Sequence, residues 1–235
     1  MKSKIIIEDK KHLQKIIAEE INLNGRNCDL NHVDVSNMTD MSELFEGSIF
    51  NGNISQWDVS NVVSMCRMFK NSKFNQDISN WDVSNVIEMT EMFAKSQFNQ
   101  GISKWDVSNV ATMKWMFACS QFNQNLLCWN TLMVKNMGGM FAKSKFNQDI
   151  SQWDTSCIKD MSFMFADSVF NQDISKWDVS GVVNMGYMFY RSHFDQDISN
   201  WDFSNVINME GIFNGSQLEH GVIDWLTTKT IKNRI

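Results

Sequence analysis

The sequence predicts an α/β repeat solenoid of eight 24-residue coils, each with a short parallel strand and a short helix, capped at both ends. Eight tryptophans recur at a constant spacing without an insertion, and methionine, phenylalanine and serine recur at fixed distances from them. The chain of 235 residues contains 17 methionines and no proline, as expected of one short unit copied many times. The tryptophans are Trp57, Trp81, Trp105, Trp129, Trp153, Trp177, Trp201 and Trp225.

The repeat unit reads W-D-V-S-N-V-x-x-M-x-x-M-F-x-x-S-x-F-N-Q-D-I-S-x and fills residues 33–225, with Val33 in the tryptophan position of the first copy. Its I-S-x-W-D-V part alternates apolar and polar residues, which predicts a strand. Its V-x-x-M-x-x-M-F part spaces apolar residues three and four apart, which predicts one or two helical turns that begin near Ser60 or Asn61 and their equivalents. A period of this length is too short for paired helices and fits a leucine-rich-repeat-like coil.

The segments outside the repeats are predicted to cap the solenoid, because an exposed end would leave apolar residues in water. The N-terminal cap takes residues 1–32, with a helix over about 8–21 and a degenerate strand from Ile21 to Leu30. The C-terminal cap or tail takes residues 226–235.

Composition and the first residues predict a cytoplasmic protein. No run approaches 18 apolar residues, and the stretch after Met1 is too short and too soon charged for a signal peptide. Five cysteines at irregular spacings predict reduced thiols rather than disulfides. The net charge of −6 argues against direct binding to nucleic acid or an anionic membrane.

The repeat F-N-Q-D-I-S-x-W-D-V-S-N-V-x-x-M-x-x-M-F resembles the BspA-like leucine-rich repeat family, over about 80% of the chain. The resemblance implies a right-handed solenoid with parallel strands, no catalytic activity and a role in protein–protein contacts. Members of the family include surface adhesins and, without export signals, proteins that look like cytosolic immunity proteins paired with secreted toxins. The sequence is more similar to the second group, because a leader and an anchor are not found in it.

Catalysis and cofactor binding are not expected. The four histidines, His12, His32, His193 and His220, lie far apart and at different phases of the 24-residue period, and the motifs of metal, phosphate or nucleophile sites are not found. The methionine and tryptophan ladders are interpreted as core, because residues that recur in every coil at one position are buried between coils. We therefore predict no enzyme, no cofactor, no metal and no small-molecule substrate.

Two groups of residues are candidates for partner binding. The first is aromatic: the tenth residue after the tryptophan position varies between copies and is Trp115, Phe163 or Tyr187 in three of them, with Tyr190 close by. Such side chains are typical binding hot spots, although packing against a neighbouring helix would also explain them. The second is a column of aspartates beside the tryptophans, broken by Asn130, which either hold turns or form an acidic stripe. Its members are Asp34, Asp58, Asp82, Asp106, Asp154, Asp178 and Asp202.

These observations predict a protein-binding solenoid without enzymatic activity. Residues 33–225 carry 22 acidic and 12 basic side chains, a net charge of −10 that suits a basic partner. The leading hypothesis is an immunity protein that binds a cognate secreted or contact-dependent toxin, such as a basic nuclease domain, and masks its active site. The alternatives are a surface adhesin and an acidic mimic of nucleic acid.

Overall fold

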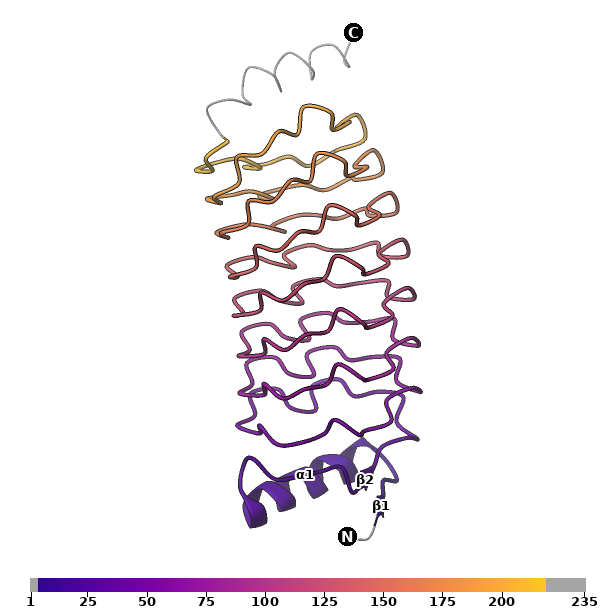
Figure 1. Cartoon of the computed structure of the whole chain (residues 1–235). Helices are drawn as coiled ribbons and strands as arrows, with labels where there is room; N and C mark the ends of the chain where they lie inside the picture. Colours follow the sequence, from indigo (N-terminus) through magenta and orange to yellow (C-terminus); the bar gives the residue numbers. More distant parts are fainter. Residues whose placement is uncertain (1–3, 219–235) are drawn as a thin grey trace.

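The repeated coils are stacked along one axis in the computed structural model, which describes residues 4–218 (Figure 1). Helix α1 (Lys10–Asn24) lies at the N-terminal end of the stack, where strand β1 (Ile5–Ile6) pairs in parallel with β2 (Val33–Asp34). Isolated parallel bridges then recur once per coil, from Asp40–Ser64 to Asn184–Asn208. The repeat solenoid is therefore present. The predicted C-terminal cap, 226–235, and Trp225 lie outside the described residues.

The secondary structure within each coil differs from the expectation. Among the described residues, α1 is the one helix and β1 and β2 are the only strands, so the coils are built from turns and single bridges. The stretch expected to be helical shows the reason. Backbone N–H groups of Arg67, Phe69 and Asn71 donate to carbonyls of the next coil, while those of Met68 and Lys70 donate to carbonyls three residues back. A helix would direct every one of these groups within its own segment, which would leave the coils unjoined.

Two left-handed residues per coil make this alternation possible. The tenth and fourteenth residues after the tryptophan position have positive φ in every coil, for example 54° at both Arg67 and Asn71. Each such residue reverses the local direction of the chain. The N–H groups of this stretch therefore donate alternately to the next coil and to a carbonyl three residues back in the same coil. The apolar spacing of three and four is thus satisfied by successive turns.

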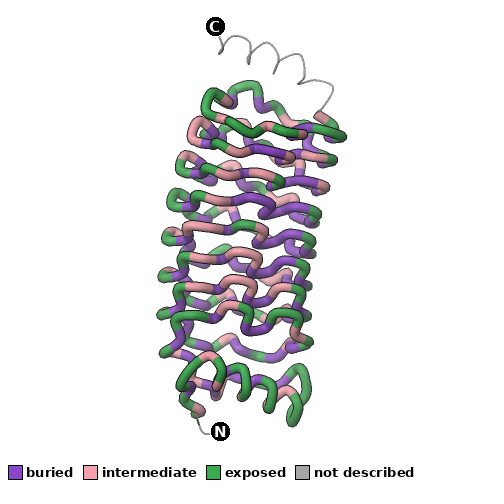
Figure 2. The backbone as a smooth tube through the Cα atoms, turned by 180° about the vertical axis from the view of Figure 1, so that it is seen from behind, coloured by how far each residue is buried: buried purple, intermediate pink, exposed green. Residues whose placement is uncertain are grey.

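The core consists of side chains stacked on their own copies, and the buried positions recur from coil to coil (Figure 2). The phenylalanine rings of one stack lie 5.4–5.9 Å apart, from Phe45 to Phe213, and those of a second stack, from Phe50 to Phe194, lie 6.1–6.3 Å apart. The methionines at the eighth and eleventh positions after the tryptophan position, from Met65 to Met188, are fully buried. Each coil thus buries its apolar residues against its neighbours rather than within itself.

Polar side chains of the core form ladders of their own. Trp105 donates its Nε1–H to the carbonyl of Ile78 at 3.1 Å, and the other tryptophans of the 24-residue series from Trp57 to Trp201 repeat this contact. Asn99 accepts the N–H of Asn123 at 2.8 Å through Oδ1, a bond that recurs in successive coils. These bonds satisfy groups that burial would otherwise leave unpaired.

At the N-terminal end, Asp9 caps α1 by accepting the N–H of His12, and Leu13 and Ile17 are buried against the first coil. The helix begins two residues later than expected and runs through Ile21, so the degenerate strand does not begin there; Asp29 instead forms a single bridge with Asn53. None of the helices in the described part of the chain is long and apolar enough to cross a bilayer.

The irregular fifth unit does not interrupt the stack. Bridges from Thr112 to Asn136 and from Asn136 to Asp160 continue through it, and Trp129 keeps its bond to the previous coil. The substitutions change the surface instead, because Leu132 and Met133 are exposed.

Candidate protein-binding groove

The structure brings together the aromatic residues at the tenth position. The ring centroids of Trp115 and Phe163 are 6.0 Å apart, although two coils separate these residues in sequence. Phe163 stacks on Tyr187 at 5.0 Å, and Tyr187 meets Tyr190 edge to face at 5.7 Å. Trp115, Tyr187 and Tyr190 are half-buried and Phe163 is exposed. Trp115, Phe163 and Tyr187 thus form one row along the solenoid, and Tyr190 extends this row within the coil of Tyr187.

A glycine lets Trp115 reach past the adjacent coil. Gly139 occupies the tenth position between Trp115 and Phe163, and a Cβ atom there would lie 2.2 Å from the Trp115 ring. The indole therefore lies over the glycine backbone. Gly211 has the same relation to Tyr187, whose hydroxyl donates to the carboxylate of Glu210.

Four alanines form the floor of a groove beside this row. They occupy the thirteenth position of four consecutive coils and are buried, with Trp115 and Tyr190 packed against them. The hollow above them has a volume of about 450 Å³. We call it the aromatic–alanine groove. Its floor residues are Ala94, Ala118, Ala142 and Ala166.

Sequence reasoning found the aromatic side of this groove but missed its floor. The signal was available: the thirteenth position holds alanine in four consecutive coils but Lys70 before them and Tyr190 after them. Alanine has no reactive, charged or aromatic group, so its side chain alone does not indicate a binding site. A helix at this segment would also have placed them differently.

Backbone conformation sets these aromatics apart from ordinary surface residues. Trp115, Phe163 and Tyr187 have φ of 55°, 57° and 59°, where a residue with a side chain costs roughly 1–2 kcal/mol more than glycine. Glycine does occupy this position at Gly139 and Gly211. Bulky aromatic residues with positive φ are uncommon. Glycine would give the same backbone at lower cost, so the difference that the aromatic residues make is the row formed by their rings.

Charged residues also line the groove. Lys95 and Lys143 are exposed at the fourteenth position, and Arg191 follows at the same position beyond them. Asp167 lies between, with Oδ atoms 3.9 Å from Lys143 Nζ and 3.3 Å from Arg191 Nε. At the N-terminal end, Glu91 pairs with Lys70. The groove therefore has an apolar floor, an aromatic side and charged lining residues.

The aspartate column holds turns. Asp58 accepts both the N–H and the hydroxyl of Ser60, and its equivalents accept the N–H of the residue two positions on. The serine hydroxyl and backbone N–H lower the pKa of Asp82, Asp106 and Asp178, and Lys4 and Ser36 lower that of Asp34 to about 2. Apart from Asp34, which is half-buried, the column is exposed, and it lies half a coil away from the alanines in sequence. The interpretation as turn-holding residues accounts for its bonds. The members are Asp34, Asp58, Asp82, Asp106, Asp154, Asp178 and Asp202.

Acid should weaken the fold through this column. In the folded chain, the pKa values of Asp82, Asp106 and Asp178 lie below the ordinary value of 3.8. Their contribution to the free energy of unfolding is therefore present above pH 3.8 and is lost as the pH falls through the folded pKa values. We expect the combined variant Asp82→Asn, Asp106→Asn and Asp178→Asn to lose less thermal stability than the natural chain between pH 6 and pH 3. Asn130 accepts the same turn bond, so asparagine keeps the geometry. Equal losses of Tm in both proteins would contradict the assignment.

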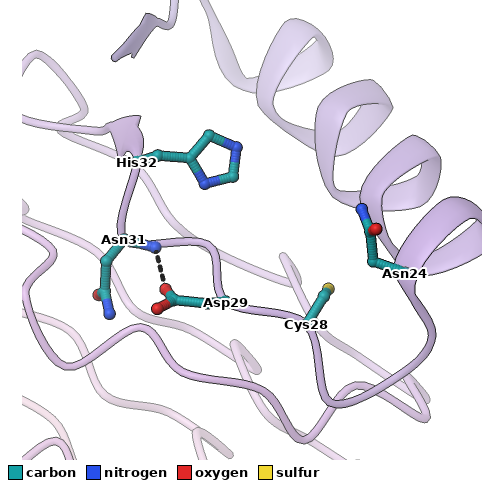
Figure 3. A pocket seen from close by; sticks show the side chains of 5 residues that line it. All are labelled: Asn24, Cys28, Asp29, Asn31 and His32. Carbon is teal, nitrogen blue, oxygen red and sulfur yellow. Dashed lines mark hydrogen bonds between the residues drawn. The ribbon is translucent and has the colours of Figure 1, made fainter. Parts of the chain in front are cut away.

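A second hollow of about 400 Å³ lies between α1 and the first coil (Figure 3). The fold already uses most polar groups around it. Asp29 accepts the N–H of Asn31, Asn24 donates to Glu20 across one helical turn, and His32 Nε2 lies 3.3 Å from Glu20 Oε1. The contact between His32 and Glu20 joins the first coil to the helix, while the other two lie within the loop and within α1. Among the described residues, no cluster of three or more histidine, cysteine or acidic side chains could hold a metal ion.

Comparisons with known proteins give one family. Residues 12–126 and 118–225 each match the family described as "Mycoplasma protein of unknown function, DUF285". No curated protein and no solved structure matches the chain.

Proposed function

Since the chain belongs to the DUF285 family of Mycoplasma proteins, which are the BspA-like repeats of that group, we propose that it is a non-enzymatic solenoid that binds a partner protein. The observation that carries the proposal is the aromatic–alanine groove. An accessible apolar hollow bordered by aromatic rings is where protein interfaces concentrate their binding energy. Every other aromatic stack of the described coils is buried in the core.

A sharper form of the proposal is an immunity protein that masks the active site of a cognate toxin. What supports it is charge. The pKa values of Asp82, Asp106 and Asp178 are lowered, and the repeats carry a net charge of −10, so a basic nuclease domain would be attracted to that face. This role would place the protein in the cytoplasm. A basic partner that binds in the groove and is attracted to the column would favour it.

Photo-crosslinking in the source cells tests the general proposal. Benzoylphenylalanine in place of Phe163 presents a reactive ring in the groove, and in place of Val63, exposed at the sixth position, it samples another part of the surface. We expect one discrete crosslinked protein from position 163. The substitution Ala142→Lys should abolish it, because a lysine would fill the floor.

The control is built into the repeat. Lys70 occupies the position of Ala142 in another coil, so the backbone accepts lysine there. The Ala142→Lys protein should therefore keep its thermal stability. A crosslink that persists with the floor filled, or equal crosslinking from positions 63 and 163, would reject the groove as the binding site.

The immunity form requires a further result. The crosslinked partner should kill or degrade nucleic acid when expressed alone and should lose that activity in a 1:1 complex with this chain. A partner without toxicity would remove the immunity role and leave protein binding intact. A partner exposed on a host cell surface would favour the adhesin. Displacement of the partner by DNA would favour the mimic.

A further inference from the structure

We infer that the occupant of the aromatic–alanine groove is an amphipathic helix of about three turns that carries acidic residues along one edge. The inference rests on the proposed function, because it concerns the partner of the same groove. Three features of the groove lead to this inference: the hydrogen bonds of its backbone, the distance between its coils and the positive charge of its lysines.

The floor offers no backbone hydrogen bonds to an occupant. The N–H of each floor alanine donates to the carbonyl three residues back, and its carbonyl accepts from the previous coil, as Ala118 accepts from Lys95 and Ala142 from Cys119. An extended segment gains its affinity through free N–H and C=O groups at an edge, which are absent from this floor. A helix satisfies its own backbone and needs only apolar contact.

The repeat distance of the coils matches a helix. The phenylalanines that directly precede the four alanines have ring centroids 5.7–5.9 Å apart, close to the rise of about 5.4 Å in one helical turn. Three such steps make about 17 Å, the length of about 11 helical residues. One small or medium apolar side chain per turn would therefore meet one alanine per coil.

The lysines that line the groove favour acidic residues in the bound helix. Lys95 and Lys143 line the groove two coils apart, and Lys143 is loosely held, with its side chain 64% exposed. Their separation corresponds to about two helical turns, so carboxylates seven residues apart would face both. On a chain of net charge −6, the positive charge of these two lysines is local and opposes the general trend.

The probe is a display library of random peptides, each long enough for about four helical turns. The library is selected on the natural protein after depletion on the Ala142→Lys variant. We expect enrichment of peptides with apolar residues three and four apart and with aspartate or glutamate seven apart. Their synthetic consensus should become helical when bound, by circular dichroism. Its affinity should fall at least tenfold in the variant Lys95→Asp and Lys143→Asp, whose new residues match Asp167 at the same position.

The variant Lys104→Asp and Lys176→Asp changes the net charge equally outside the groove and should bind the consensus as the natural protein does. Peptides that are extended when bound, that lack acidic residues, or that bind both lysine variants equally would overturn the inference. So would a failure to enrich any groove-dependent peptide. A dimer of the free protein that Ala142→Lys dissociates would replace the helix by a second copy. These outcomes leave the crosslinking test of protein binding to be decided separately.

Discussion

Replacing Phe117 by alanine should destabilise the chain by about 3–5 kcal/mol, the usual cost of removing a buried aromatic ring. The ring lies 5.7 Å from Phe93 and from Phe141, 4.2 Å from Phe122 and 6.4 Å from Trp129. Because coils contact only their neighbours, a cavity in a central coil weakens the interfaces on both of its sides. Urea unfolding followed by tryptophan fluorescence measures the change.

The matched control for this substitution is Phe163→Glu. Phe163 is 36% exposed, and Glu43 and Glu91 occupy the same position in other coils with the same left-handed backbone. We expect its unfolding free energy to change by less than about 1 kcal/mol. Phe117→Leu, which leaves a smaller cavity, should fall between the two. Equal stabilities of Phe117→Ala and Phe163→Glu would show that the phenylalanine stack is not the core.

Replacing Trp115 by glutamate should weaken binding of the crosslinked partner by about 30-fold or more, which corresponds to roughly 2 kcal/mol for a central aromatic hot spot. The substitution removes the ring that reaches over Gly139 to Phe163, and so it removes the support of the aromatic row. Glu91 holds the same position one coil earlier, so the fold accepts the change. Calorimetric titration measures the affinity.

Two further observations make this prediction specific. Trp115→Phe should retain part of the affinity, because a smaller ring still lies on the glycine. The Tm of Trp115→Glu should stay close to that of the natural chain, which separates loss of the interface from loss of the fold. An unchanged affinity would mean that the row serves only local packing.

The architecture could be predicted from the sequence because the repeat period is unbroken and the apolar positions are invariant between copies. The stacking of tryptophan, methionine and phenylalanine follows directly from that period. The strand and helix of each coil could not be predicted correctly. Apolar residues three and four apart indicate which side chains are buried but not the backbone that buries them. Left-handed turns at residues such as Arg67 and Asn71 bury the same side chains that a helix would bury. Most coils carry a residue other than glycine at these two positions, so the sign of positive φ that Gly47, Gly139, Gly211 and Gly215 give there is weak.

The candidate site was predictable in part. Trp115, Phe163, Tyr187 and Tyr190 break the repeat and were predicted as partner-binding residues; the structure places them in one row, and their binding role stays a prediction. Their contact across Gly139 could not be foreseen, because it depends on a ring that crosses to another coil. The aspartates recur with the repeat, and their bonds to serines explain that recurrence. Positions that differ between the repeats thus indicated the candidate groove, and positions that recur in the repeats indicated the residues that hold the fold.

One comparison tests most directly whether the groove is the protein-binding surface. The affinity of the purified partner is measured by calorimetry for the natural chain, for Ala142→Lys and for the double variant Asp82→Asn and Asp106→Asn. Our account predicts that the groove variant loses at least a hundredfold in affinity while the aspartate variant binds within about threefold of the natural chain. Full affinity of the Ala142→Lys protein, together with a large loss in the aspartate variant, would contradict it and move recognition to the acidic face.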